Sequence, residues 1–87
     1  MIAAARKVDR KLEAIDRILR KNLKSKEFGE YSAAQSRWYT FREANCDAER
    51  DLYTELSVAS LAYAACAEAD TRQRVDELKI MYAWLFQ

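Results

Sequence analysis

The near absence of helix-breaking residues is the strongest constraint on this sequence. Its 87 residues contain no proline and a single glycine, Gly29. Tight turns between β-strands usually need these residues, whereas helix interiors are most stable without them. Most of the remaining residues are helix formers such as alanine, leucine, arginine, lysine and glutamate. The sequence therefore predicts an all-α protein, and its length predicts a single domain over residues 1–87.

The apolar residues repeat with the period of an α-helix and predict three helices. The first helix should cover about residues 3–23, because its apolar residues recur at steps of four, three and four (Val8, Leu12, Ile15 and Leu19). A polar break is expected at residues 24–29, followed by a second helix over about residues 30–56. The third helix should begin near Ser57 or Ser60, either of which can cap it, and residues 70–71 are a candidate kink. We expect a three-helix bundle in which the second and third helices form an antiparallel hairpin.

Charge divides the chain into two parts. Residues 1–26 hold nine basic and three acidic residues, giving 9 − 3 = +6, and residues 27–87 hold six basic and eleven acidic residues, giving 6 − 11 = −5. A basic amphipathic helix can bind nucleic acid or a membrane surface. It can equally be the solvated outer face of a bundle helix. Acidic residues interrupt the basic field at Asp9, Glu13 and Asp16, which favours the solvated face.

Two cysteines, Cys46 and Cys66, lie twenty residues apart. If the chain turns back near Leu56, each lies about ten residues from the turn, and an antiparallel hairpin brings them face to face. A disulfide needs Cα atoms roughly 4.4–6.8 Å apart, and closing such a loop stabilises a fold by about 3 kcal/mol. The spacing favours a disulfide and leaves open the alternative of two reduced, buried cysteines in a cytoplasmic protein.

The same register pairs other residues of the second and third helices. Facing positions should sum to about 112, as Cys46 and Cys66 do. An ion pair and a cation–π contact are then expected across the seam. The facing pairs are Arg42 with Asp70, Trp38 with Arg74, and Gln35 with Glu77.

The usual arrangements for catalysis are missing from the sequence. It has no histidine, no glycine-rich loop, and no serine or cysteine beside an evident base. Two cysteines alone do not make a tetrahedral metal site. We therefore expect a protein that is not an enzyme and has no catalytic residue, no metal and no cofactor.

Two motifs in residues 35–78 resemble a known family. The first reads Q-x-x-W-x-x-F-R-E-x-x-C and consists of Gln35, Trp38, Phe41, Arg42, Glu43 and Cys46. The second reads C-x4-T-x2-R-x2-E-L and consists of Cys66, Thr71, Arg74, Glu77 and Leu78. In this order and spacing they resemble the lysozyme-inhibitor LprI-like family of small secreted proteins.

The resemblance implies an exported helical protein, periplasmic or secreted, whose signal peptide has been removed. It implies a Cys46–Cys66 disulfide and a structural motif formed by Gln35, Trp38, Arg42, Thr71, Arg74 and Glu77, to which the register adds Asp70. It also implies a protein partner, with binding and inhibition of a lysozyme or a related cell-wall hydrolase as the activity. Aromatic residues are the expected anchors for that partner, and the candidates are Tyr39, Tyr53, Tyr63 and Trp84.

Two other hypotheses remain beside the resemblance. One is a cytoplasmic helical adaptor or nucleic-acid-binding protein that uses the basic first helix and keeps free thiols. The other is a homodimer formed through residues 80–86, a tail that is apolar on nearly all sides. We expect an exported protein that does not bind nucleic acid. No membrane span is expected, because no run of the sequence approaches the ~20 apolar residues that a bilayer requires.

Overall fold

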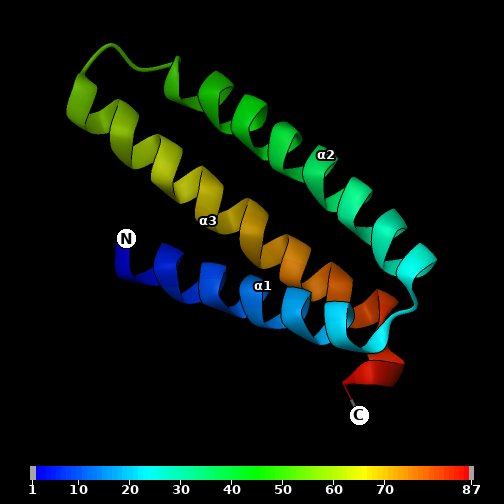
Figure 1. Ribbon diagram of the computed structural model, residues 1–87. Helices are drawn as coiled ribbons and strands as arrows, with labels where there is room; N and C mark the ends of the chain where they lie inside the picture. The colour runs from blue at the N-terminus through cyan, green and yellow to red at the C-terminus, as the bar shows by residue number, and fades with distance from the viewer. Residues whose placement is uncertain (1, 87) are drawn as a thin grey trace.

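The computed structural model describes residues 2–86, with the side chains of residues 6–86. This part of the chain forms three α-helices, α1 (Ile2–Asn22), α2 (Ser25–Arg50) and α3 (Leu56–Met81), and a short 3₁₀ helix, η1 (Ala83–Leu85). The predicted all-α fold with a hairpin of the second and third helices is confirmed (Figure 1).

The three helices form an elongated molecule of 47 × 23 × 16 Å. α2 runs antiparallel to both other helices, and α3 packs against α1 and α2 (Figure 1). The α2–α3 hairpin crosses α1 at an angle and extends past its N-terminal end. We call residues 43–68, which include the loop and the flanking turns of both helices, the hairpin end.

The apolar core lies at the opposite, open end of the hairpin. The predicted stripe of α1 (Val8, Leu12, Ile15 and Leu19) is buried there, together with Tyr31 of α2 and Val75 and Leu78 of α3. Tyr82, Leu85 and Phe86 of the C-terminal tail pack against this cluster. Each fully buried apolar side chain contributes about 1.5–3 kcal/mol. Most of the apolar burial therefore stabilises only one end of the molecule.

The first connection is shorter than predicted. α2 begins at Ser25, so the expected break over residues 24–29 is wrong and Gly29 lies inside a helix. The backbone N–H of Lys24 donates a hydrogen bond to Oε1 of Glu27, 2.9 Å away. This carboxylate satisfies a free donor and carries its charge at the positive end of the helix dipole. The cap allows α2 to start five residues earlier than the prediction.

The second connection is longer than predicted. α2 ends at Arg50 and α3 starts at Leu56, whereas we expected helix up to residue 56 and a new start at Ser57 or Ser60. Residues 51–55 are all exposed, so no burial compensates for keeping them helical. α3 is one uninterrupted helix through residues 70–71, so no new helix starts there. Thr71 Oγ1 donates to the Ala67 carbonyl of the preceding turn over 2.7 Å. Within residues 2–86, no helix has the length and apolar character needed to cross a lipid bilayer.

Candidate functional site

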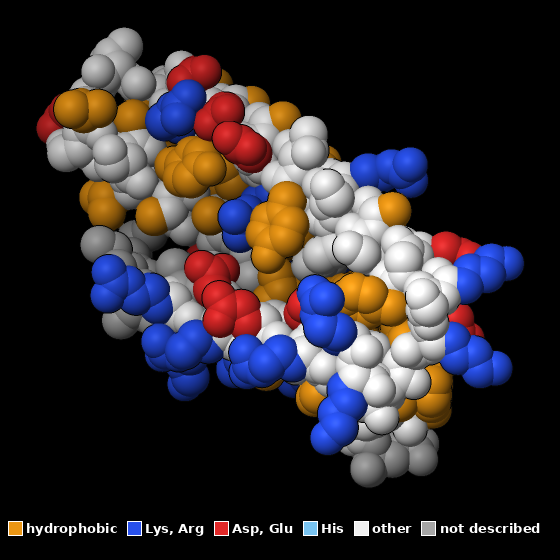
Figure 2. Space-filling model, viewed as in Figure 1, with side chains coloured by type: hydrophobic (Ala, Val, Ile, Leu, Met, Phe, Trp, Pro, Cys, Tyr) orange, Lys and Arg blue, Asp and Glu red, His pale blue; other side chains and the backbone are white. Residues whose placement is uncertain are grey.

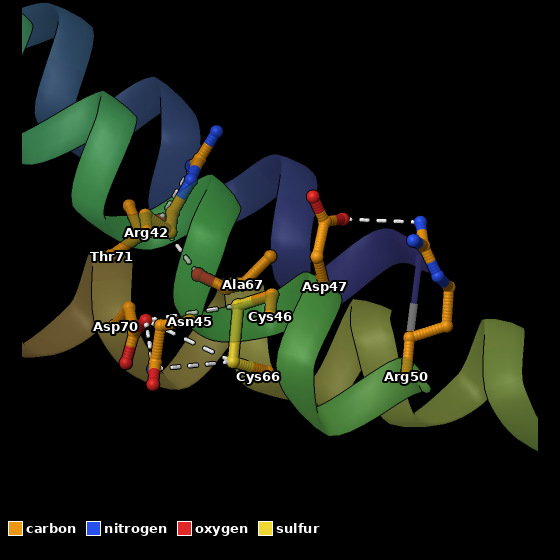
Figure 3. Close-up of a disulfide and its surroundings, with 9 residues drawn as sticks. All are labelled: Arg42, Asn45, Cys46, Asp47, Arg50, Cys66, Ala67, Asp70 and Thr71. Atoms are coloured by element: carbon orange, nitrogen blue, oxygen red, sulfur yellow. Dashed lines mark hydrogen bonds and ion pairs between the residues drawn. A yellow bond between two sulfur atoms is a disulfide. The ribbon is translucent and has the colours of Figure 1, made fainter. Parts of the chain in front are cut away.

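A disulfide joins the two helices of the hairpin. Cys46 of α2 and Cys66 of α3 are bonded, with their Cα atoms 5.5 Å apart (Figure 3). Both residues are buried. This confirms the predicted bridge. It lies outside the core cluster, which has no member in residues 43–68, and therefore stabilises the part of the fold that has little apolar core.

A carboxylate and an amide lie against the disulfide. Asn45 Nδ2 donates to Asp70 Oδ2 over 2.9 Å, and this oxygen lies 3.7 Å from Cys46 Sγ and 3.8 Å from Cys66 Sγ (Figure 3). The three potential ligand atoms of Asp70 and the two cysteines fall within 4.8 Å of one another. The sulfurs are bonded to each other, however, and offer no thiolate to a metal. Asp70 is thus a partner of Asn45, a residue that the sequence motif does not include.

Arg42 turns toward α1 instead of toward Asp70. Its Nη1 donates to Thr71 Oγ1 over 2.9 Å (Figure 3). The same nitrogen lies 3.8 Å from Oδ1 of Asp9. The predicted Arg42–Asp70 ion pair is therefore wrong. Arg42 faces Thr71, so the residue numbers of facing positions sum to 113 here and not to 112. In addition, α1 contributes the carboxylate of Asp9, which lies beside the guanidinium. Arg42 consequently connects all three helices.

Arg42 also takes the place that was expected for Arg74. Its guanidinium lies 5.3 Å from the ring centre of Trp38 and 5.2 Å from that of Tyr39. Arg74 instead donates from Nε to Oε1 of Gln35 over 2.9 Å, so its predicted cation–π contact with Trp38 is wrong.

The expected facing pair of Gln35 and Glu77 is joined through a third residue. Arg74 bonds to both of them, because its Nη1 pairs with the carboxylate of Glu77 while its Nε bonds to Gln35. The structure therefore brings Gln35, Arg74 and Glu77 of the motif together in one polar group.

Tyr31 is a buried polar residue that the sequence analysis did not single out. Only 3% of it is exposed, and its hydroxyl has no hydrogen-bond partner. Burial raises the pKa of Tyr31 far above its usual value, and the negative charge of nearby Asp16 raises it further. Tyr39 is half-exposed, and burial raises its pKa as well, against the opposing effect of the Arg42 cation. Tyr31 lies four residues before Gln35 on the same helical face, and this spacing was the available signal.

The four candidate anchor residues do not form one surface. Tyr53 lies in the loop of the hairpin end, and Tyr63 lies close by on α3 under the guanidinium of Arg50, 5.7 Å from its ring centre. Tyr39 lies midway along α2, with its ring 4.9 Å from that of Trp38. Trp84 is exposed in η1, at the opposite end of the molecule.

Exposed aliphatic side chains gather at the hairpin end. Leu52 is 76% exposed and Leu56 is 80% exposed, and Val58 and Leu61 follow on the first turns of α3. The surrounding residues are acidic. Residues 43–68 contain six acidic residues and one basic residue, giving 1 − 6 = −5. The apolar pattern of the sequence did not indicate that Leu52 and Leu56 form an exposed surface.

These features define a class of small, disulfide-stapled helical proteins whose described part has a buried polar seam and an exposed, acidic hairpin end. Within this class, the chain belongs to the LprI family of lysozyme inhibitors, since the family model described as Lysozyme inhibitor LprI matches residues 1–78. The match includes α1 and is thus wider than the two motifs of residues 35–78. Searches of curated proteins and of solved structures gave no match.

Proposed function

We propose that this chain is an exported protein that binds and inhibits a lysozyme or a related cell-wall hydrolase. Membership in the LprI family supports an inhibitor of this kind. The observation that carries the proposal is the hairpin end, where exposed apolar side chains lie in an acidic setting and a disulfide holds the two helices together. A binding surface needs anchors of this kind on a rigid support.

The disulfide supports export. Disulfides persist in oxidising compartments such as the periplasm and the extracellular space, and are rare in the cytosol. The cytoplasmic alternative predicts free thiols, whereas both cysteines of this chain are paired. We therefore favour the exported inhibitor over the cytoplasmic adaptor.

Charge complementarity supports a basic partner. Lysozymes of the common type are basic proteins, and they cleave with a pair of carboxyl groups in their active-site cleft. The net charge of −5 over residues 43–68 attracts such a protein over a distance of about one Debye length, ~8 Å at physiological salt. Leu52, Tyr53 and Leu56 then supply the apolar contact. Tyr63 lies within the hairpin end, next to Arg50, whereas Tyr39 and Trp84 lie elsewhere and are less suited to the same partner.

The proposal is tested by following how lysozyme clears a suspension of bacterial cells. Wild-type protein in molar excess should slow clearing, and the variant Leu52→Ala/Leu56→Ala should slow it much less. The matched control is Phe41→Ala, which removes an exposed apolar side chain of α2 outside the hairpin end and the C-terminal tail and should inhibit like the wild type. Unchanged clearing at high excess of the wild-type protein would refute inhibition. Equal loss in both variants would refute the hairpin end as the surface.

A specific observation also favours self-association. Ile80, Met81 and Trp84 are exposed next to one another in the sequence, although Tyr82, Leu85 and Phe86 of the same tail pack on the core. We propose that these three residues form a homodimer contact. Light scattering should give the mass of a dimer at high concentration and that of a monomer for Trp84→Ala. A strictly monomeric wild-type protein would refute this contact.

A further inference from the structure

α1 separates its residues into three faces by charge. Its apolar residues face the core. Its acidic residues face α2: Asp9 lies 3.8 Å from Arg42, and Glu13 and Asp16 line a groove of about 380 Å³ together with Gln35 and Tyr39. At 100° per residue these acidic positions fall on one side of the helix. No acidic residue of α1 is therefore left for its outer face.

The outer face of α1 is basic. Five exposed side chains occupy the remaining part of its circumference, namely Arg6, Lys7, Arg10, Lys11 and Lys21. Among the side chains of residues 6–86, none of these five has a carboxylate within ion-pair distance. Two arginines lie at the acidic side, where Arg17 lines the groove with Glu13 and Asp16, and Arg20 pairs with Asp16. Figure 2 shows Lys and Arg side chains in a row over α1 along one edge of the molecule. The row forms one continuous positive surface.

The neighbouring part of α3 extends this surface. Lys79 shares a groove of about 390 Å³ with Lys7 and Lys11 of α1, and the only carboxylate that lines this groove is that of Asp76. Arg72 also lines the groove, with its guanidinium paired to Glu68. Three lysines against one free carboxylate leave an excess of positive charge. The groove between α1 and α3, at the border of the outer face of α1, thus has room for an anionic group.

We propose that the outer face of α1 docks this protein on the surface of a bilayer that contains anionic phospholipids. The binding is electrostatic, because the apolar stripe of α1 is buried in the core and is not free to enter the lipid. Each basic residue near an anionic membrane raises the affinity by about fivefold. A straight helix of 21 residues is about 31 Å long, so it places this row of charges along a flat surface.

A bilayer fits this face better than a nucleic acid does. Proteins that bind single strands place aromatic side chains among the basic ones so that bases can stack, and the outer face of α1 has no aromatic residue. The paired cysteines also favour an exported protein over a cytosolic or nuclear one, and cellular nucleic acids lie in the cytosol and nucleus. Nucleic-acid binding is nevertheless included in the experiment as an opposing outcome.

Docking through α1 orients the rest of the molecule. The hairpin diverges from α1 toward its closed end (Figure 1), so the hairpin end projects from the membrane when α1 lies on it. The net charge of −5 over residues 43–68 is repelled by the same anionic surface, which reinforces this orientation. The acidic, apolar surface is then presented to proteins in solution.

The experiment is co-sedimentation of the purified protein with vesicles. Wild-type protein should sediment with vesicles that contain phosphatidylglycerol, stay in solution with pure phosphatidylcholine vesicles, and be released by added salt. The variant Arg10→Gln/Lys21→Gln removes two charges of the outer face and should bind about 25-fold more weakly. The control Lys26→Gln/Arg37→Gln makes the same change in net charge on exposed positions of α2 and should bind nearly as the wild type does.

Three results would overturn the proposal. The first is wild-type protein that stays in solution with phosphatidylglycerol vesicles at low salt. The second is an equal loss of binding in the two double variants. That result would mean that the net charge of the protein determines vesicle binding and the outer face of α1 does not. The third is DNA binding that the α1 variant weakens while vesicle binding is absent. None of these depends on lysozyme inhibition, since the hairpin end is unchanged in both variants.

Discussion

Arg74 of α3 donates a hydrogen bond from Nε to Oε1 of Gln35 in α2, over 2.9 Å. Gln35 is buried, and only 10% of the Arg74 side chain is exposed. The bond links residues 39 positions apart in the sequence. It fixes the α2–α3 seam between the apolar core and the disulfide.

The variant Gln35→Ala should lower the free energy of unfolding by about 2 kcal/mol, because it leaves a largely buried guanidinium N–H without its acceptor. Urea denaturation followed by circular dichroism measures this change. Gln73→Ala, an exposed glutamine on α3, is the matched control and should change stability by less than about 0.5 kcal/mol. Equal effects of the two substitutions would contradict this role for Gln35.

Replacing both cysteines, as Cys46→Ala/Cys66→Ala, should cost about 3 kcal/mol, since the unfolded chain then regains the entropy of an open loop. The loss should concentrate at the hairpin end. Amide hydrogen exchange should therefore speed up in residues 47–65 more than in the turns of α1 around Leu12 and Ile15. Uniform acceleration along all helices would show that the bridge does not act locally. Adding a reductant to the alanine variant should have no further effect.

Gly29→Ala should stabilise the protein by about 0.5–1 kcal/mol, because alanine restricts the unfolded chain and favours the helix. Gly29 lies within α2, without positive φ, and an added Cβ would meet no atom within 4 Å. The opposite substitution Ala33→Gly, at an exposed position one turn later, should destabilise by a similar amount. Thermal unfolding of both variants gives the comparison, and a lower melting temperature for Gly29→Ala would contradict the prediction.

Tyr31 should make the protein lose stability in alkali. Up to about pH 10 both the folded and the unfolded chain keep the phenol protonated, so Tyr31 adds no pH dependence. Above pH 10.0, the ordinary pKa of a tyrosine, the unfolded chain releases the proton first, because the folded-state pKa is higher. The unfolded state then binds fewer protons, and stability falls by up to about 1.4 kcal/mol per pH unit.

Tyr31→Phe should remove this alkaline loss and leave stability near neutral pH equal or higher, since the lost hydroxyl has no hydrogen-bond partner. Urea denaturation at a series of pH values from neutral to alkaline measures the slope. Tyr53→Phe, at the exposed loop, leaves Tyr31 intact and should keep the wild-type slope. The same slope in wild type and Tyr31→Phe would rule out Tyr31 as its source.

The sequence predicted the helices and the disulfide because these depend on local or regular features. The spacing of Val8, Leu12, Ile15 and Leu19 indicates a buried helix face wherever that face packs, and equal distances from a turn place Cys46 opposite Cys66. The helix ends were less predictable. Gly29 signals a break, yet a single hydrogen bond from Lys24 to Glu27 starts α2 before it.

The contacts of Arg42 could not be predicted from the hairpin alone. A pairing rule for two helices assigns Asp70 to it, but the third helix supplies Asp9 and draws the guanidinium to the other side. Asp70 is then free to bond to Asn45. The surface at Leu52 and Leu56 was missed for a related reason. An apolar residue is expected to be buried unless the packing of all three helices is known, and both of these side chains are exposed.

The disulfide lies on the hairpin outside the apolar cluster that α1 helps to form. Beyond it, Leu52, Tyr53 and Leu56 are exposed and contribute little to the stability of the fold. The disulfide stabilises this end of the hairpin, whereas the apolar core stabilises the other end. Substitutions at these positions should therefore leave the fold intact. Under the proposed function, a few changes at this tip are enough to alter the choice of target, while the scaffold behind the tip stays constant.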